Sequence, residues 1–192
     1  MAKNGTSKKR GSKAEIGNMD FTMNRRFIDY YRENKKETHF ELLDEDPYEE
    51  IFEKGRRKFH YREEYVKKSV DKCKKIWESC GFSNDLSLVY EKGYEDHKGK
   101  EHAFLESCIK KLGYSMYSFV AEDFEEENLV GRRYVWKTDE IDMEKLAREI
   151  ILSDIGGKLS LAESVFVVDN KNDMVFFLYD DRGILFYTER EK

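Results

Sequence analysis

The five residues Tyr179, Asp180, Asp181, Arg182 and Gly183 form the motif of this sequence that is best suited to chemistry. The planar guanidinium of Arg182 can hold Asp180 or Asp181 through two hydrogen bonds, or it can bind the anionic group of a ligand. Asp side chains also accept hydrogen bonds from backbone N–H groups in turns, and glycine allows the positive φ of tight turns. The motif therefore predicts a charged turn that holds a hairpin, with a ligand site as the less favoured alternative. Adjacent residues of a strand point to opposite faces, so the two Asp side chains are poorly placed to share a metal ion.

A second group of possible metal ligands lies in the segment DHKGKEH, which contains Asp96, His97, Glu101 and His102. Imidazole and carboxylate groups bind Zn²⁺ or Mn²⁺, and such a site would indicate a metal-dependent hydrolase or nuclease. A glycine interrupts the segment, so one helical face is not expected to present both histidines. The sequence also lacks the G-x-S-x-G, phosphate-loop, H-E-x-x-H and Cys-His nucleophile patterns. We therefore predict no catalytic residue, no metal and no cofactor, and an enzyme is the alternative.

Acidic residues occur in blocks, which favours an interaction with a basic partner. One block is Asp44, Glu45 and Asp46, and a second consists of Glu122, Asp123, Glu125, Glu126 and Glu127. Clustered carboxylates repel nucleic acid and steer the approach of a basic protein. A nuclease toxin is such a protein, because it must bind phosphates. We predict that these residues bind a basic protein partner, with solubility as the alternative role of the charge.

Two basic segments support a different partner, a nucleic acid. Five cations lie within residues 1–18, and residues 54–62 contain Arg56, Arg57 and Lys58 next to aromatic side chains. Cations beside aromatic rings can contact a phosphate backbone. The first segment has no interleaved aromatic residues and the second is short, so we predict a flexible basic tail over residues 1–18 and consider nucleic acid an unlikely partner.

Composition sets the class of protein. The chain has 192 residues, 35 Lys and Arg against 40 Asp and Glu, a net charge of −5, 14% aromatic residues and a single proline. So many aromatic residues can build a core and are atypical of a disordered chain, and the length fits one domain. No apolar run is long enough for a membrane span or follows the basic N-terminus as in a secretory signal. The three cysteines include no C-x-x-C pair and are expected to be reduced and buried, which favours the cytoplasm.

The apolar pattern predicts the elements that position these groups. Spacing of three and four residues predicts helices over 21–34, 62–81, 102–113 and 142–154, and Asp46 and Pro47 suggest the start of another. Apolar runs and alternation predict strands over 38–43, 85–92, 114–123, 128–139, 164–170, 173–180 and 184–189. The fold class is therefore α+β: a mixed, largely antiparallel sheet, packed by amphipathic helices and ending in a β-meander.

Four segments also occur in a recognisable order. The early strand HFELL is followed by the helix YREEYVKKSVDKCKKIWESC and the strand DLSLVY, and a C-terminal hairpin ends in YDDRG. This order resembles an uncharacterised bacterial family of domains of unknown function, whose early strand is of the RFEL type, with Arg where this chain has His39. The resemblance covers roughly residues 19–192, implies a single α+β domain and implies no established activity. By analogy with small immunity proteins that neutralise toxins, we expect a non-enzymatic cytoplasmic protein-binding domain.

Overall fold

A computed structural model describes residues 25–93, 99–121 and 129–189 of the chain. Seven strands form one sheet in the order β1-β9-β8-β7-β4-β6-β5, and β2 and β3 form a separate hairpin. Every pairing between neighbouring strands is antiparallel. The elements are α1 (Phe27–Asn34), β1 (Lys36–Glu41), β2 (Tyr48–Glu53), β3 (Arg56–Tyr61), α2 (Glu63–Ser79), β4 (Leu86–Gly93), α3 (Lys100–Glu106), β5 (Ile109–Ala121), β6 (Leu129–Ile141), α4 (Met143–Ile155), β7 (Val165–Asp169), β8 (Met174–Leu178) and β9 (Gly183–Thr188). The α+β prediction and the C-terminal meander are confirmed.

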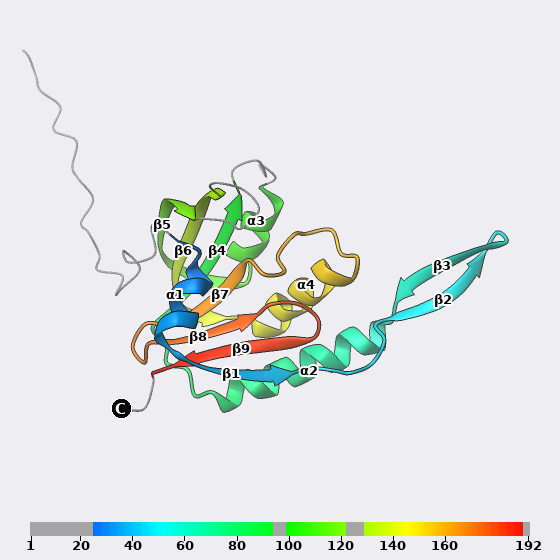
Figure 1. Cartoon of the computed structure of the whole chain (residues 1–192), viewed down its shortest axis with the longest axis horizontal. Helices are drawn as coiled ribbons and strands as arrows, with labels where there is room; N and C mark the ends of the chain where they lie inside the picture. Colours follow the sequence, from blue (N-terminus) through cyan, green and yellow to red (C-terminus); the bar gives the residue numbers. More distant parts are fainter. Residues whose placement is uncertain (1–24, 94–98, 122–128, 190–192) are drawn as a thin grey trace, which may run out of the picture.

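Helices α2 and α4 cover one face of the sheet, and α1 covers part of the other (Figure 1). The α2 side holds the larger core, in which Tyr65 and Cys73 of α2 pack with Leu146 of α4 and Trp136 of the sheet. Within the described residues, no helix is both long enough and apolar enough to cross a membrane.

The two long helices form where their apolar stripes predict them. Helix α2 buries residues at three- and four-residue spacing, and Gly81 follows it with a φ of 68°. Helix α4 begins at Asp142, whose side chain accepts a hydrogen bond from the backbone N–H of Lys145. It ends at Gly156, whose φ of 118° is left-handed and suits glycine at a helix end. The helix ends thus lie next to the glycines that were expected to stop them.

The helix suggested by Asp46 and Pro47 is wrong, because this segment forms a β-hairpin. Asp46 accepts a hydrogen bond from the N–H of Tyr48 in an Asx turn, which leads into a strand. Lys54 and Gly55 connect the strands with φ values of 51° and 73°. Positive φ at both loop residues is typical of the tight hairpin turns that match strand twist. Strand β2 therefore turns back into β3 and leaves the body of the protein (Figure 1).

The predicted helix over 102–113 is only half right. Helix α3 ends at Glu106, and strand β5 begins at Ile109 and pairs with β6 through two register shifts. Leu112, which the helical pattern places inside, is 61% exposed on this edge strand. Pairing with the edge of β6 has overridden the local helical pattern.

A buried ion pair attaches α1 to the sheet. The Arg133 guanidinium donates to Oε1 of Glu91 over 2.7 Å, and both side chains are almost fully buried. Glu91 also accepts a hydrogen bond from the backbone N–H of Phe27, and Arg133 donates to the carbonyl of Arg25. Because each charge depends on the other, loss of either partner would leave a buried charge unpaired.

Candidate functional site

The loop between β8 and β9 contains the predicted turn. The backbone N–H and Nε of Arg182 each donate to Asp180 over 2.7 Å. The carbonyl of Arg182 accepts a hydrogen bond from the N–H of Leu42, which fixes the loop against the segment that follows β1. The prediction that Arg182 holds a neighbouring Asp in a turn is confirmed, and the residue held is Asp180.

Gly183 is required for a different reason from the predicted one. Its φ is not among the positive values of the described residues. Instead, a Cβ atom at this position would lie 2.4 Å from Oη of Tyr179 and 2.7 Å from Nε2 of His39. These two side chains are hydrogen-bonded to each other over 2.9 Å and line a hollow of about 530 Å³ beside α1. The glycine is therefore needed for space.

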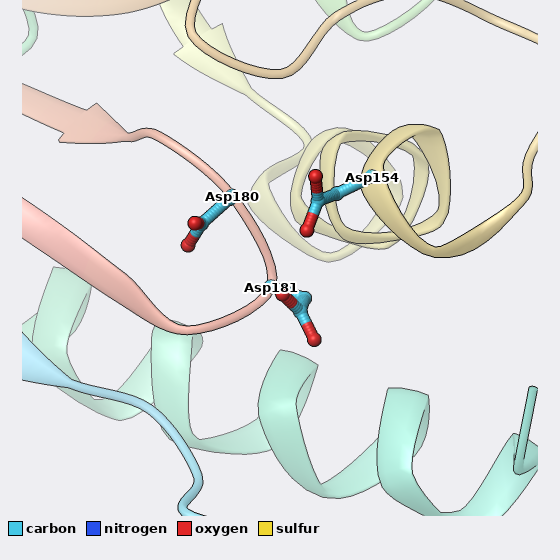
Figure 2. A group of neighbouring side chains, drawn as sticks. All are labelled: Asp154, Asp180 and Asp181. Carbon is cyan, nitrogen blue, oxygen red and sulfur yellow. The ribbon is translucent and has the colours of Figure 1, made fainter. Parts of the chain in front are cut away.

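Asp181 is held in a different environment from Asp180. Its carboxylate accepts a hydrogen bond from the hydroxyl of Tyr65 on α2 over 2.8 Å, and it lies beside Asp154 at the end of α4 (Figure 2). Burial, followed by the hydrogen bond with Asp154, raises the pKa of Asp181 to about 6. Asp181 therefore remains partly protonated in weakly acidic solution, because a buried carboxyl beside other carboxylates ionises only at a cost.

These groups open onto a hollow of about 620 Å³ that we call the acidic hollow. Its carboxylates come from three separate segments of the chain. The lining residues are Leu43, Asp44, Glu45, Asp46, Pro47, Tyr48, Tyr65, Asp154, Ile155, Asp181 and Arg182. The structure thus brings the first predicted acidic block together with two residues of the YDDRG motif.

The net charge of the residues that line the acidic hollow is negative. Among the described residues, Arg182 is the one cation that lines it, and Arg182 is already paired with Asp180. Glu45 is partly neutralised by Arg62 and Lys68, at 3.4 and 3.6 Å. Burial and the charges of nearby carboxylates raise the pKa of Tyr48, which lies at the edge of the hollow. A cation that enters would therefore meet unbalanced negative charge.

Three carboxylates of this region could hold a metal ion. One oxygen from each of Asp154, Asp180 and Asp181 lies within 4.8 Å of the others (Figure 2). The expectation that Asp180 and Asp181 diverge does not hold, because both lie in a loop beyond β8, where strand alternation does not apply. Carboxylate oxygens suit a hard divalent cation, but Arg182 occupies Asp180 and competes with any metal there.

The other candidate residues are dispersed or lie outside the described part of the chain. Glu122, Asp123, Glu125, Glu126 and Glu127 lie outside it, as do the basic tail of residues 1–18, Asp96 and His97. His102 packs its ring against Trp136, with centroids 4.8 Å apart. Cys73 and Cys108 are buried and Cys80 is partly so, with no disulfide among them, and burial raises the pKa of Cys73 to about 12.

Most of the basic segment 54–62 lies in the β2–β3 hairpin, and two of its cations are paired there. Arg57 forms an ion pair with Glu50, and Lys58 forms one with Glu53. These cations are therefore partly neutralised within the hairpin, which weakens the case for a phosphate-binding surface.

Sequence reasoning missed Tyr65 and Asp154 as members of the site. Both belong to amphipathic helices, and the helical pattern assigned Tyr65 to the core without its hydroxyl contact. Asp154 is the last polar residue before the glycines that end α4, a position with no chemical signature of its own. Only the packing of both helices against the β8–β9 loop brings them to Asp181.

The fold and the hollow define an α+β domain with a negatively charged surface site. The chain belongs to the family of a domain of unknown function, DUF3885, whose model matches residues 23–191. The resemblance to an uncharacterised domain family is thereby confirmed. Comparison with curated proteins and with solved structures finds no match.

Proposed function

We propose that this chain is a non-enzymatic protein-binding domain and that its acidic hollow receives cationic side chains of a basic partner. One observation carries the proposal. Five carboxylates from the segment after β1, the end of α4 and the β8–β9 loop converge on one hollow. Clustered charges of one sign raise the local concentration of an oppositely charged ligand and select its orientation.

The raised pKa of Asp181 beside Asp154 supports a cationic occupant. A positive charge placed between two carboxylates favours their ionised forms and lowers their pKa. An entering Lys or Arg side chain would therefore replace the proton and relieve the repulsion between the two groups. Arginine also offers several donors in a planar arrangement that suits paired carboxylates.

A toxin of the nuclease type is the partner class that we propose. A nuclease must present cations to bind the phosphates of its substrate. A protein that covers these cations with carboxylates would block the substrate site, as an immunity protein does. This role places the domain in the cytoplasm of a bacterial cell, where such a toxin would act.

Charge reversal in the acidic hollow tests the proposal. A fluorescent peptide of alternating lysine and serine serves as the probe, with binding measured by anisotropy at low and at physiological salt. In one variant, Asp44→Lys and Asp154→Lys reverse two exposed charges of the hollow. In the matched control, Asp71→Lys and Glu78→Lys make the same change on the exposed side of α2.

We expect the hollow variant to weaken binding by about tenfold or more and the control by about twofold at most. Equal losses in both variants would show that the peptide responds to net charge alone, and the proposal would fail. It would also fail if Mn²⁺ raised the melting temperature of the wild type and Asp154→Asn removed that effect, because the occupant would then be a metal ion.

A further inference from the structure

The β2–β3 hairpin, which we call the arm (residues 48–61), projects from the body of the protein (Figure 1). Every residue of β3, and every residue of β2 except Ile51, is exposed. The base of the arm is fixed, because the N–H of Arg62 donates to the carbonyl of Pro47 over 2.7 Å. Two strands on their own are marginally stable in water, so packing against a partner would stabilise this arm.

The strand register places four aromatic side chains on one face of the arm. Tyr48 lies opposite Tyr61, and Phe52 and Phe59 lie on the same side because they are separated from these residues by even numbers of positions. Their exposed fractions are 39% for Tyr48, 37% for Tyr61, 76% for Phe52 and 62% for Phe59. At about 200 Å² for each aromatic side chain, this aromatic face exposes roughly 400 Å². Patches of this size on monomers are often functional.

The ion pair of Glu50 and Arg57 also lies on the aromatic face, and the opposite face of the arm is polar apart from Ile51. There Glu49 lies opposite His60, Ile51 opposite Lys58, and Glu53 opposite Arg56. Apolar residues that alternate in this way normally face a protein core. The aromatic face of the arm has no such core among the described residues, so the amphipathic pattern points to a partner.

The arm and the acidic hollow are continuous. Tyr48 belongs to the aromatic face and also lines the hollow. The aromatic face supplies about half of the roughly 800 Å² that one protein contributes to a specific interface, and the hollow extends it. The face also accepts cations, since the guanidinium of Arg57 lies 5.1 Å from the ring centroid of Phe59.

We infer that the arm and the acidic hollow form one interface, and that the segment which docks there carries apolar side chains directly beside its cations. The apolar side chains pack on the aromatic face, while the neighbouring Lys or Arg side chains enter the hollow. This inference rests on the proposed function, because it assumes that the hollow takes the cations. Phosphates are poor occupants, since the arm's Arg57 and Lys58 are paired with glutamates and the hollow is negative.

Two fluorescent peptides of equal length and charge test the inference. One alternates lysine with serine, and the other alternates lysine with leucine. The arm variant carries Phe52→Ser and Phe59→Ser, and its control carries Ile51→Ser and His60→Ser on the opposite face. The hollow variant, Asp44→Lys with Asp154→Lys, is measured in parallel with both peptides.

We expect the wild type to bind the lysine–leucine peptide about tenfold more tightly than the lysine–serine peptide. The arm variant should lose this preference, while its control keeps it and the hollow variant binds both peptides weakly. A preference that survives in the arm variant would overturn the inference and leave the proposed function standing. If the hollow variant instead binds both peptides as tightly as the wild type does, the proposed function is overturned.

Two further measurements exclude other occupants of the arm. If light scattering shows a dimer of the wild type that the arm variant abolishes, the occupant of the arm is a second copy of the chain. If a mobility assay shows that the wild type binds a single-stranded oligonucleotide and the arm variant does not, the occupant of the arm is a nucleic acid. Either result overturns the inference.

Discussion

The substitution Asp181→Asn should make the protein more stable at neutral pH. The wild-type carboxyl is held beside Asp154 in a largely buried position, with a pKa of about 6, whereas an unfolded chain leaves it near 3.9. The folded state therefore binds more protons between these two values. Its favourable contribution is fully present below pH 3.9 and is lost as the pH rises through 6. Asparagine can still accept the hydrogen bond of Tyr65, and it carries no charge to lose.

The size of the effect follows from the difference between the two pKa values. About two pKa units correspond to just under 3 kcal/mol, and water that reaches the hollow reduces this to about 2 kcal/mol. The free energy of unfolding of the wild type should thus fall by about 2 kcal/mol relative to the variant between about pH 4 and pH 7.

Urea unfolding at several pH values between these limits, followed by circular dichroism, measures this difference. Glu78→Gln removes a charge from an exposed position on α2 and should track the wild type to within about 0.5 kcal/mol at every pH. The reasoning is refuted if Asp181→Asn and the wild type differ by the same free energy at both ends of the pH range. A constant difference would mean that the carboxyl titrates alike in the folded and unfolded states.

The fold allows three more tests by urea unfolding. Gly183→Ala should cost about 1 to 3 kcal/mol because its Cβ would overlap Tyr179 and His39, and adding Tyr179→Phe, which removes the nearest atom, should recover part of that loss. Arg133→Met should cost about 3 to 5 kcal/mol because it leaves Glu91 charged and buried, and limited proteolysis should then cut near α1 before the rest of the domain. The free energy of unfolding of the arm variant should lie within about 0.5 kcal/mol of the wild-type value, because the substituted aromatic side chains are exposed. A larger loss of stability would mean that the arm packs on the body of the protein.

Much of the fold is encoded in local patterns of the sequence. The apolar stripes of α2 and α4 and the apolar runs of β7 and β8 predict these elements near their observed bounds. Helical and strand periodicities differ, so a long amphipathic segment identifies its own structure.

The two wrong segments failed because their local signals were ambiguous. Asp46 followed by Pro47 is compatible with a helix start and also with an extended entry into a strand. The Lys54-Gly55 pair between two short segments that contain Tyr and Phe was the signal for a hairpin. At Ile109 the helical spacing lost to pairing with β6, a partner that lies about 30 residues further along the chain.

The sequence by itself determined the α+β class, most helices and strands of the body, and a charged turn in which Arg182 can bind a neighbouring Asp. These depend on neighbours within a few residues, for which spacing is informative. Tertiary structure alone brought Asp154 and Tyr65 to Asp181, joined them to Asp44 in one hollow, and set Gly183 against Tyr179 and His39. Those contacts join segments far apart in the chain, so their geometry is set by how helices pack on the sheet and no local pattern contains it.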